Sequence, residues 1–490
     1  MAEGAADGVT GAGPRRLTAR EAVALVAADF TELPAPEGSY EPEGSYRSYG
    51  PDGPLSWQGY GASRVRAGER TGERESVVCG TALLGTTRAV LISFEFGFLG
   101  GSLGERTGDR LEAAHTYARE HRLPVVSLVA TGGSRMQEGM RALVQLQRVA
   151  RQSALTRAAR LPQLAVLRDP TTGGGWATLG AGADVVLALP GAQVGFAGSR
   201  VRPPDADPAA YTAEAQLAAG AVDAVVPERD LAGTLALWLR LLSAPPAVPA
   251  AAASADPLIT PAAVPAAGPV PPPPALGLRV LPVTGWEAVR NARSARRPRA
   301  HAYLDAYFDH RAAIGGDRCG GTDEGMLCGF GTRAGDGRTV AYAAQTGTAT
   351  RPAGYRTAAR LVRLADRLRI PVLTLVDTPG AANGAEAERQ GAGAAIADLF
   401  AAMACAETPL TTLLIGEGGS GGALALAAPG NTWATPDSYF SVIAPEPAAA
   451  ILKRPAAEVR STADQLRIRP QDLVELGVVR GIVEPSGPSS

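Results

Sequence analysis

The feature that most constrains how this 490-residue chain can fold is an internal repeat. Residues 122–133 match residues 369–380, an offset of 369 − 122 = 247. Further matches follow in the same order: residues 79–80 with 328–329, 88–92 with 338–342, Gly173-Gly174 with Gly421-Gly422, 188–190 with 434–436, and 220–226 with 477–483. So many ordered matches indicate two copies of one fold.

Each copy alternates short apolar runs with longer stretches rich in Ala, Leu and Arg. The predicted strands are residues 125–129, 164–167 and 185–189 in the first copy, and 370–376 and 410–415 in the second. The predicted helices are residues 106–121 and 140–159, and then 355–368 and 393–406. Because the strands are continuously apolar, we expect both faces of each sheet to be buried under helices. The sequence therefore predicts an α/β fold built from a repeating β–β–α unit.

A segment without core-forming residues separates the copies. Residues 244–274 are almost all Ala, Pro, Val and Gly and end in four prolines, a composition that favours extended polyproline structure. The predicted division is a partly flexible extension (1–53) with a short helix at 21–30 and little else to pack, a first domain (54–243), a linker (244–275), a second domain (276–485) and a tail (486–490).

Composition excludes several classes of protein. Lys and Arg number 47 against 48 Asp and Glu, so no basic surplus favours nucleic acid as a partner. No apolar run is long enough for a membrane helix or a signal peptide, which leads us to expect a cytoplasmic protein. The four cysteines and four histidines lack the spacing of a metal site, so we expect no metal and reduced, mostly buried thiols.

The candidate chemistry lies in the two glycine pairs. Gly173-Gly174 and Gly421-Gly422 each follow an apolar strand and precede a small-residue helix. Glycine leaves its amide unshielded, and a helix start has free N–H groups with partial positive charge, so each junction could bind an oxyanion. A single pair could equally be a helix cap, but its occurrence in both copies favours an oxyanion hole.

Three other patterns are weaker. Residues 418–422 match the G-x-S-x-G turn of serine hydrolases, but the last histidine, His310, precedes Ser420, so the Ser–acid–His order cannot be completed. Ser420 is then a small residue that lets substrate approach. The acidic residues 384–389 could supply a base or simply begin a solvated helix. Residues 377–380 form a strand-end turn, since no Walker A motif accompanies them.

These motifs resemble a known family. The first half is similar to the β subunit, and the second to the α subunit, of the bacterial acetyl-CoA carboxylase carboxyltransferase, in the crotonase superfamily. The resemblance rests on residues 94–104, 132–138, 169–174 and 194–201, and on residues 370–380, 415–425 and 439–446. It implies two tandem crotonase-like ββα-spiral domains.

The resemblance also implies an activity. Such a protein is the carboxyltransferase of a biotin-dependent acetyl-CoA or propionyl-CoA carboxylase, and it moves CO2 from carboxybiotin to the α-carbon of an acyl-CoA through an enolate. Gly173 and Gly174 would hold the enolate oxygen, and Gly421 and Gly422 the ureido oxygen of biotin. The substrate-binding residues would be Gly100, Gly101, Gly132, Gly133, Arg135, Phe196, Ala197, Gly380, Ser420 and Ala423.

The implied partners are a biotin carboxylase, a biotin carboxyl carrier protein and further copies of this chain, as a homodimer or larger homo-oligomer. The resemblance is incomplete, because a four-cysteine zinc ribbon is missing and residues 343–348, 379–384 and 444–447 depart from the family motifs. Two alternatives remain: a malonyl-thioester decarboxylase related to malonate decarboxylase, and a non-catalytic scaffold. Loss of CO2 from malonyl-CoA without biotin would favour the former.

Overall fold

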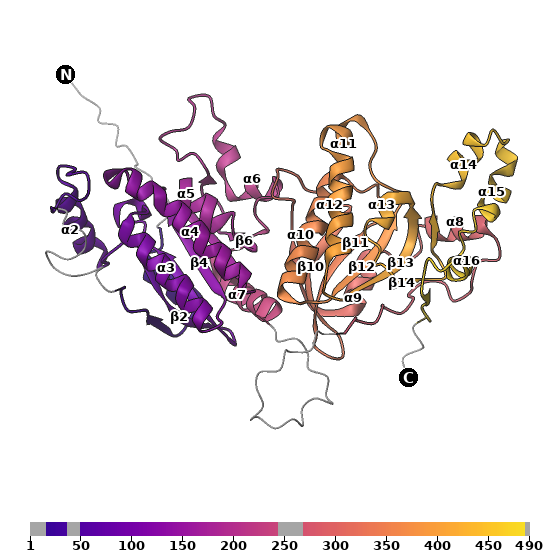
Figure 1. The fold of residues 1–490 in the computed structure, drawn as a ribbon, viewed down its shortest axis with the longest axis horizontal. Coiled ribbons are helices and arrows are strands. Elements are labelled where there is room, and N and C mark those ends of the chain that lie inside the picture. Colours follow the sequence, from indigo (N-terminus) through magenta and orange to yellow (C-terminus); the bar gives the residue numbers. More distant parts are fainter. Residues whose placement is uncertain (1–15, 37–49, 244–267, 486–490) are drawn as a thin grey trace, which may run out of the picture.

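The computed structural model describes residues 16–36, 50–243 and 268–485. It consists of two halves, each built around an eight-stranded sheet flanked by helices (Figure 1). Residues 1–15 and 37–49 of the predicted extension, most of the predicted linker and the predicted tail lie outside the described residues.

The first half begins with α1 and ends with α7. Its strands are β1 (Phe30–Glu32), β2 (Val77–Leu84), β3 (Thr87–Phe94), β4 (Val125–Thr131), β5 (Gln163–Thr172), β6 (Val185–Ala188), β7 (Val194–Gly195) and β8 (Ala224–Val225). Its helices are α1 (Ala19–Val26), α2 (Tyr60–Thr71), η1 (Leu99–Gly101), α3 (Glu105–Glu120), η2 (Met136–Glu138), α4 (Met140–Ala158), α5 (Gly173–Gly175), η3 (Trp176–Gly180), η4 (Pro208–Tyr211), α6 (Ala213–Ala218) and α7 (Glu228–Ser243).

The second half begins with α8 and ends with β16. Its strands are β9 (Phe308–Ile314), β10 (Met326–Arg333), β11 (Thr339–Gln345), β12 (Val372–Thr378), β13 (Leu410–Gly419), β14 (Thr432–Ala434), β15 (Tyr439–Ser441) and β16 (Gly481–Ile482). Its helices are α8 (Gly285–Arg293), α9 (Ala300–Tyr307), α10 (Pro352–Leu368), α11 (Ala385–Arg389), α12 (Ala392–Cys405), α13 (Ser420–Leu424), α14 (Pro445–Ile451), η6 (Ala456–Glu458), α15 (Val459–Gln465) and α16 (Pro470–Glu475).

The two sheets have the same topology, which confirms the predicted repeat and the predicted α/β class. The first has the order β1-β2-β3-β4-β5-β6-β8 with β7 on β5, and the second has β9-β10-β11-β12-β13-β14-β16 with β15 on β13. The first three strands of each sheet are antiparallel and the others parallel. Parallel neighbours need a crossover, and α3, α4, α10 and α12 provide it. The predicted helices and strands that we assigned begin and end within a few residues of these elements.

The start of the chain packs more than we expected. Thr18 and Glu21 form a capping box for α1, which buries its apolar face and begins two residues before the predicted helix. β1 then pairs with β2, where the ring of Phe30 lies over Gly80, and a Cβ on Gly80 would lie 2.4 Å from that ring. A bare glycine is therefore what admits β1 to the sheet.

The second half likewise begins earlier than predicted. Val270 and Ala275 belong by sequence to the linker, but both are buried. The Ala275 amide donates to the Glu484 carbonyl at 2.9 Å, and the Tyr307 hydroxyl donates to the Pro271 carbonyl at 2.8 Å. Proline-rich chain can pack in an extended form because its own backbone needs few partners. Residues 268–275 therefore belong to the second domain.

The halves share a core and a buried ion cluster. Trp238 of α7 meets Phe330 of β10 edge to face, with ring centroids 6.2 Å apart. Asp223, next to β8, accepts hydrogen bonds from Arg318 at 2.6 Å and Arg360 at 2.8 Å, both from the second half. Burial would raise the pKa of the Asp223 carboxyl, but the two guanidinium groups hold it below its usual value. Asp223 therefore links the two halves through buried ion pairs.

Replacing Asp223→Ala should lower the free energy of unfolding by about 3–5 kcal/mol, because it leaves two arginines without their buried counter-charge. Thermal or denaturant unfolding of the purified chain measures this loss. The control is Asp305→Ala, which removes a surface ion pair with Arg311 and should cost less than about 1 kcal/mol. Equal effects of the two variants would contradict the assigned role of Asp223.

A buried histidine lies between α3 and α4. His115 is 1% exposed, and its Nδ1 lies 3.0 Å from the Thr156 hydroxyl, while Nε2 has no partner among the described side chains. Burial lowers the pKa of His115 to about 4, with the nearby Arg119 guanidinium lowering it further. The ring is therefore packed in its neutral form.

We expect His115 to make stability depend on pH below neutrality. The folded-state pKa lies below the unfolded value of about 6.5, so the stabilising effect is complete above pH 6.5 and is lost as the pH falls toward 4. Across this range, the wild type should lose up to about 1.4 kcal/mol per pH unit more than the variant His115→Gln. Unfolding measured from pH 7 to 4 for both proteins tests this, and parallel curves would refute it.

Candidate functional site

The two glycine-bearing junctions are equivalent structures at a constant offset of 247 residues. In both sheets the parallel pairing shifts by two residues, between the pairs Val129–Leu167 and Thr131–Thr171 and between the pairs Val376–Leu414 and Thr378–Gly418. By this register Thr171 is equivalent to Gly418, so Gly173 in the first half is equivalent to Ser420 in the second, and not to Gly421. The equivalent glycines are therefore Gly174-Gly175 and Gly421-Gly422, one residue away from the match made on sequence alone.

A tight turn after β4 and β12 forms one wall of each junction. Gly133 and Gly380 have φ angles of 108° and 139°, in the region that favours glycine. Their amides donate to the hydroxyls of Thr131 at 3.0 Å and Thr378 at 3.1 Å. The Gly133 carbonyl accepts a hydrogen bond from the Leu103 amide at 2.9 Å. In the second half, the Gly380 carbonyl likewise accepts one from the Thr350 amide at 3.2 Å.

Gly100, Gly101 and Gly132 support the first junction through their backbone. The Gly132 amide donates to the Gly100 carbonyl at 2.8 Å. A Cβ on Gly101 would lie 2.1 Å from the Ala130 carbonyl oxygen, so only glycine fits this approach. A Cβ on Gly133 would lie 3.6 Å from the Gly173 Cα. The structure therefore gathers these predicted glycines around one point.

The helix that begins at each junction starts with a left-handed residue. Gly173 has a φ of 63° and Ser420 one of 53°. The Gly173 amide donates to the Phe196 carbonyl at 3.0 Å and is therefore occupied. The Gly174 amide has no acceptor among the residues that the structure describes. The predicted pair thus contributes one available donor in the first half, Gly174, and Gly173 shapes the turn.

The Arg135 side chain lies in the interior of the first half. It is fully buried and pairs with Glu75 and Glu138, while its Nη2 donates to the Ser102 carbonyl at 2.8 Å. The Arg135 amide also donates to Leu103, which in turn holds Gly133. Burial would raise the pKa of Glu75, but Arg135 lowers it to about 2. Arg135 therefore braces the loop from inside, and its expected contact with substrate stays a prediction.

An exposed aromatic ring and a cavity lined by charged side chains are further features of the first half. Phe196 is 73% exposed, and Ala197 beside it is half-buried. A cavity of about 620 Å³ lies between α2 and η1 and is lined by Phe98, Glu69 and Glu73 together with Arg64, Arg74 and Arg106. Phe98, two residues before Gly100, connects this cavity to the loop that supports the first junction.

The second junction is held by side chains that the sequence did not reveal as site residues. The Gly422 carbonyl accepts hydrogen bonds from Gln345 Nε2 at 3.4 Å and from the Tyr355 hydroxyl at 3.1 Å. A Cβ on Gly422 would lie 2.5 Å from the Ala381 nitrogen. Ala423 is fully buried, so it can act only through its backbone. The only sequence signal for Gln345 was its place at a strand end, before a glycine-containing turn.

The three weaker sequence patterns, residues 384–389, residues 377–380 and Ser420, occupy the following places in the structure. Glu386 of α11 is 71% exposed and pairs with Arg389, which agrees with a solvated helix. The carboxyl of Asp377 is buried between Arg297 at 2.5 Å and Arg299 at 3.2 Å, so it anchors the turn after β12. The Ser420 hydroxyl lies 3.8 Å from the position of a Cβ on Gly380, at the rim of the second junction.

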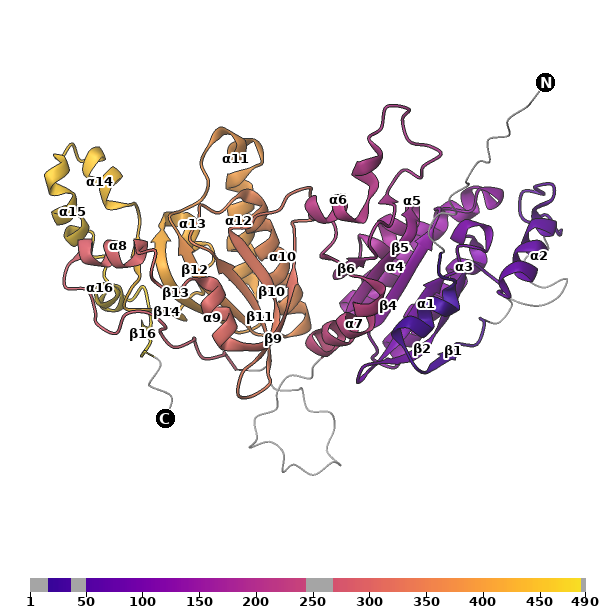
Figure 2. The same ribbon diagram turned by 180° about the vertical axis from the view of Figure 1, so that it is seen from behind.

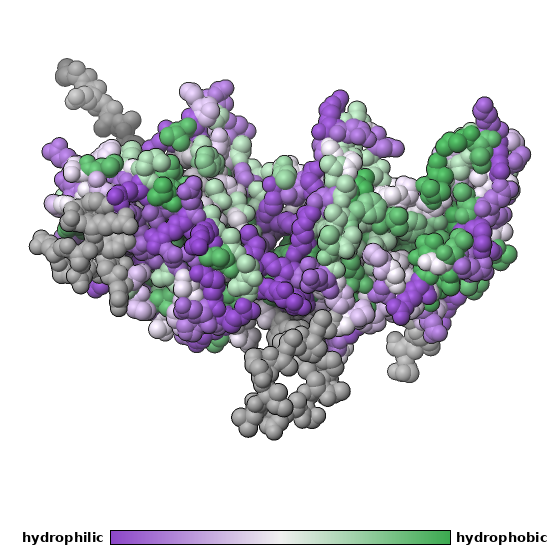
Figure 3. Space-filling model, viewed as in Figure 1, coloured by the Kyte–Doolittle hydropathy of each residue, from purple (hydrophilic) through white to green (hydrophobic). Residues whose placement is uncertain are grey.

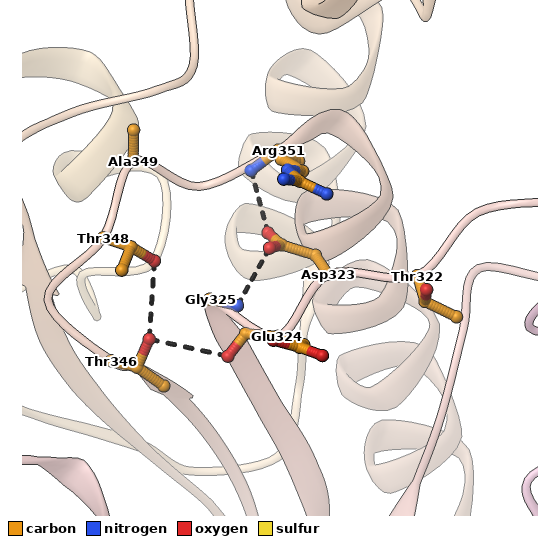
Figure 4. A pocket seen from close by; sticks show the side chains of 8 residues that line it. All are labelled: Thr322, Asp323, Glu324, Gly325, Thr346, Thr348, Ala349 and Arg351. Carbon is orange, nitrogen blue, oxygen red and sulfur yellow. Dashed lines mark hydrogen bonds between the residues drawn. The ribbon is translucent and has the colours of Figure 1, made fainter. Parts of the chain in front are cut away.

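A polar cavity of about 560 Å³ adjoins the second junction (Figure 4). Thr346, Thr348, Glu324 and Arg351 line it, and Asp323 accepts the amides of Gly325 at 2.9 Å and Arg351 at 2.8 Å. The Thr348 carbonyl accepts the Thr378 hydroxyl at 2.8 Å, which connects the cavity wall to the turn of the junction.

Metal ligands and membrane helices have no counterpart in the described ranges. No group of three or more His, Cys, Asp or Glu side chains is placed there to hold a metal ion. None of the helices described has the length and apolar character to cross a bilayer. Cys79 and Cys328 are buried, but Cys319 and Cys405 are exposed. We expected most of the four thiols to be buried, and only two of them are.

The two glycines of the second junction should respond differently to a methyl group. A Cβ on Gly421 meets no atom within 4 Å, whereas one on Gly422 meets backbone at 2.5 Å and the Tyr355 hydroxyl at 2.6 Å. Gly422→Ala should therefore lower the melting temperature by several degrees, and Gly421→Ala should change it little. Calorimetry on both variants measures this. A larger loss for Gly421→Ala would show that the packing is misassigned.

Comparisons with known proteins agree with this geometry. Residues 56–225 match the carboxyl transferase domain family, and residues 280–489 match the family described as acetyl co-enzyme A carboxylase carboxyltransferase-like. These two ranges coincide with the two halves and include both junctions.

Individual relatives cover most of the chain. The acetyl-coenzyme A carboxylase carboxyl transferase subunits beta/alpha of Salinispora arenicola are 40% identical over 86% of this chain and 75% of the relative. A probable biotin-dependent acyl-coenzyme A carboxylase beta3 subunit of Mycobacterium bovis is 33% identical over 86% of this chain and 83% of the relative.

A solved structure shows the same fold. The transcarboxylase 12S structure, a hexamer with hydrolysed methylmalonyl-coenzyme A bound, superposes with a TM-score of 0.72 at 19% identity and covers 96% of this chain and 87% of that one. The two halves are therefore tandem crotonase-like domains, as expected. By its relatives and its domains, the chain belongs to the acetyl-CoA carboxylase carboxyltransferase family.

Proposed function

We propose that this protein is the carboxyltransferase component of a biotin-dependent acyl-CoA carboxylase, with acetyl-CoA or propionyl-CoA as the acceptor. The observation that carries the proposal is the repeated junction, in which a strand end and a helix start present backbone amides at the same place in each half. Carboxyl transfer to an α-carbon creates negative charge on two oxygens, one on the thioester and one on the urea of biotin. Two junctions match two oxyanions.

The first junction is suited to the enolate oxygen. Gly174 is buried, and its amide lacks an acceptor in the described part of the chain. A buried N–H without a partner is costly, so an oxygen of the ligand would recover that cost. One such donor is commonly worth about 3–4 kcal/mol in the transition state. The arginines that line the 620 Å³ cavity beside Phe98 suit the phosphates of coenzyme A.

The second junction fits the ureido end of biotin. When bound there on its carrier, biotin supplies the carboxyl group. Gly421 is exposed, a Cβ on it would meet no atom, and the Gly421 and Gly422 amides have no acceptor in the ranges described. Gln345 and Tyr355 fix the Gly422 carbonyl and so keep the first turn of α13 in place. These residues would orient the urea oxygen toward backbone N–H groups.

A second copy of the chain would bring unlike junctions together. In both views α6, α10 and α12 lie between α5 and α13, so the junctions of one chain do not face each other (Figures 1 and 2). Phe196 and Val442 hold equivalent places after β7 and β15 and are 73% and 77% exposed. Apolar side chains, including those of Leu424 and Ile451, also reach the surface over α13 and α14 (Figure 3). A homo-oligomer would bury them.

The remaining partners follow from the reaction. A biotin carboxylase and a biotin carboxyl carrier protein would load and deliver the carboxyl group. Malonyl-CoA, the product from acetyl-CoA, would then serve fatty acid synthesis. The cytoplasmic location expected from the sequence stays a prediction.

The decisive experiment is carboxyl transfer by the purified protein in the reverse direction, from malonyl-CoA or methylmalonyl-CoA to free biotin. We expect carboxybiotin to form together with acetyl-CoA or propionyl-CoA. No transfer from either substrate would overturn the proposal. Release of CO2 from malonyl-CoA at the same rate with and without biotin would instead support the decarboxylase, and an inert protein that binds an active carboxyltransferase would support the scaffold.

A bulky residue at the second junction should stop turnover without unfolding the protein. Gly421→Val places its side chain where ligand would approach, so kcat should fall by about 100-fold or more while the melting temperature is retained. The control is Gly233→Val, because Gly233 on α7 also has open space around its Cβ. Unchanged kcat in Gly421→Val would show that this glycine does not face the ligand.

A further inference from the structure

The two junctions differ in what covers the glycine whose amide is available. In the first half, a Cβ on Gly174 would lie 2.3 Å from the Leu146 side chain, and Gly174 is buried. In the second half, a Cβ on the equivalent Gly421 would meet no atom within 4 Å, and Gly421 is exposed. A leucine therefore covers the first junction, and the second is open.

The sequence of the covering helix explains this difference. The connection from Thr131 to β5 has the same length as that from Thr378 to β13, so the 247-residue offset holds throughout it. At this offset Gly393 corresponds in sequence to Leu146. A Cβ on Gly393 would also meet no atom within 4 Å. One side chain is thus absent from the position that closes the first junction.

The backbone of the covering helix also changes. The first half has one continuous helix here, α4, whereas the second has the short α11 followed by α12. The break lies at Gly391, whose φ of 77° is left-handed. Side chains before the break no longer continue the helix that packs beside the junction. The opening over Gly421 therefore results from a missing side chain and an interrupted helix together.

Apolar and polar surfaces both reach this opening. Leu424 of α13 is 48% exposed and Val442 after β15 is 77% exposed. The Gly421 amide and the Ser420 hydroxyl are polar groups at the same helix start. A ligand that suits this combination has an apolar ring body and a polar oxygen at one edge.

We propose that Gly393 sets the size of ligand that the second junction accepts, and that its missing side chain admits a ring system bearing a urea oxygen. Leu146 does the reverse in the first junction, where it leaves room for a slender acyl thioester. Gly393 is thus a specificity residue on a helix beside the site, without a reacting group. The inference rests on the proposed function, since it assigns the ring to biotin.

The variant Gly393→Leu gives the second junction the residue of the first. We expect the KM for free biotin to rise about 10-fold or more, while the KM for malonyl-CoA changes less than about 2-fold. Saturation-transfer NMR of biotin, recorded without acyl-CoA, gives a readout independent of turnover and should weaken in parallel. The melting temperature should stay within about 2 °C of the wild type, because the new side chain enters open space.

Two further variants make the result specific. Gly233→Leu places the same residue on the exposed face of α7, where open space also surrounds the Cβ, and should change neither KM. Gly393→Ala adds only a methyl group and should raise the KM for biotin by less than Gly393→Leu. An unchanged KM and an unchanged NMR signal for biotin in Gly393→Leu would overturn the inference. Absence of transfer in the wild type would instead refute the proposed function itself.

Discussion

Close backbone approach at the end of the paired parallel strands is the constraint on which both junctions depend. The pairing of β4 with β5, like that of β12 with β13, shifts by two residues before the last pair, and the chain then turns through left-handed residues. A side chain at Gly101 or Gly422 would collide with backbone atoms. Backbone amides without an acceptor in the described residues therefore follow from how the sheet ends, and the proposed chemistry would use them.

Much of this architecture could be predicted from the sequence, because strands that are buried on both faces of a sheet consist of unbroken apolar runs. The offset of 247 residues located the repeat, and each helix that we predicted begins within a few residues of its predicted start. The match of the glycine pairs failed by one residue because Ser420 adopts the left-handed conformation that glycine supplies in the first half. Matching by residue type aligned one glycine pair with the other, whereas the register of the strands aligns Gly173 with Ser420.

Buried polar side chains were the residues least accessible to prediction. Arg135 occurs in a motif near the glycine turn, and nothing local distinguishes a substrate contact from an internal brace. Its partner Glu75 is 60 residues away in sequence, and only the fold brings them together. Gln345 is similar, since its contact with Gly422 spans 77 residues. Such pairs cost little only when fully satisfied, a condition set by tertiary structure.

The two halves are held together by a shared core as well as by the peptide chain that connects them. Trp238 packs against Phe330, and Asp223 binds two arginines, through residues on opposite sides of residues 244–267. Association of the halves is thus a property of their folded surfaces. The peptide connection contributes an effective concentration, which saves the entropy of a bimolecular encounter. Two separately translated polypeptides with these surfaces would form the same unit once their concentrations exceeded its dissociation constant.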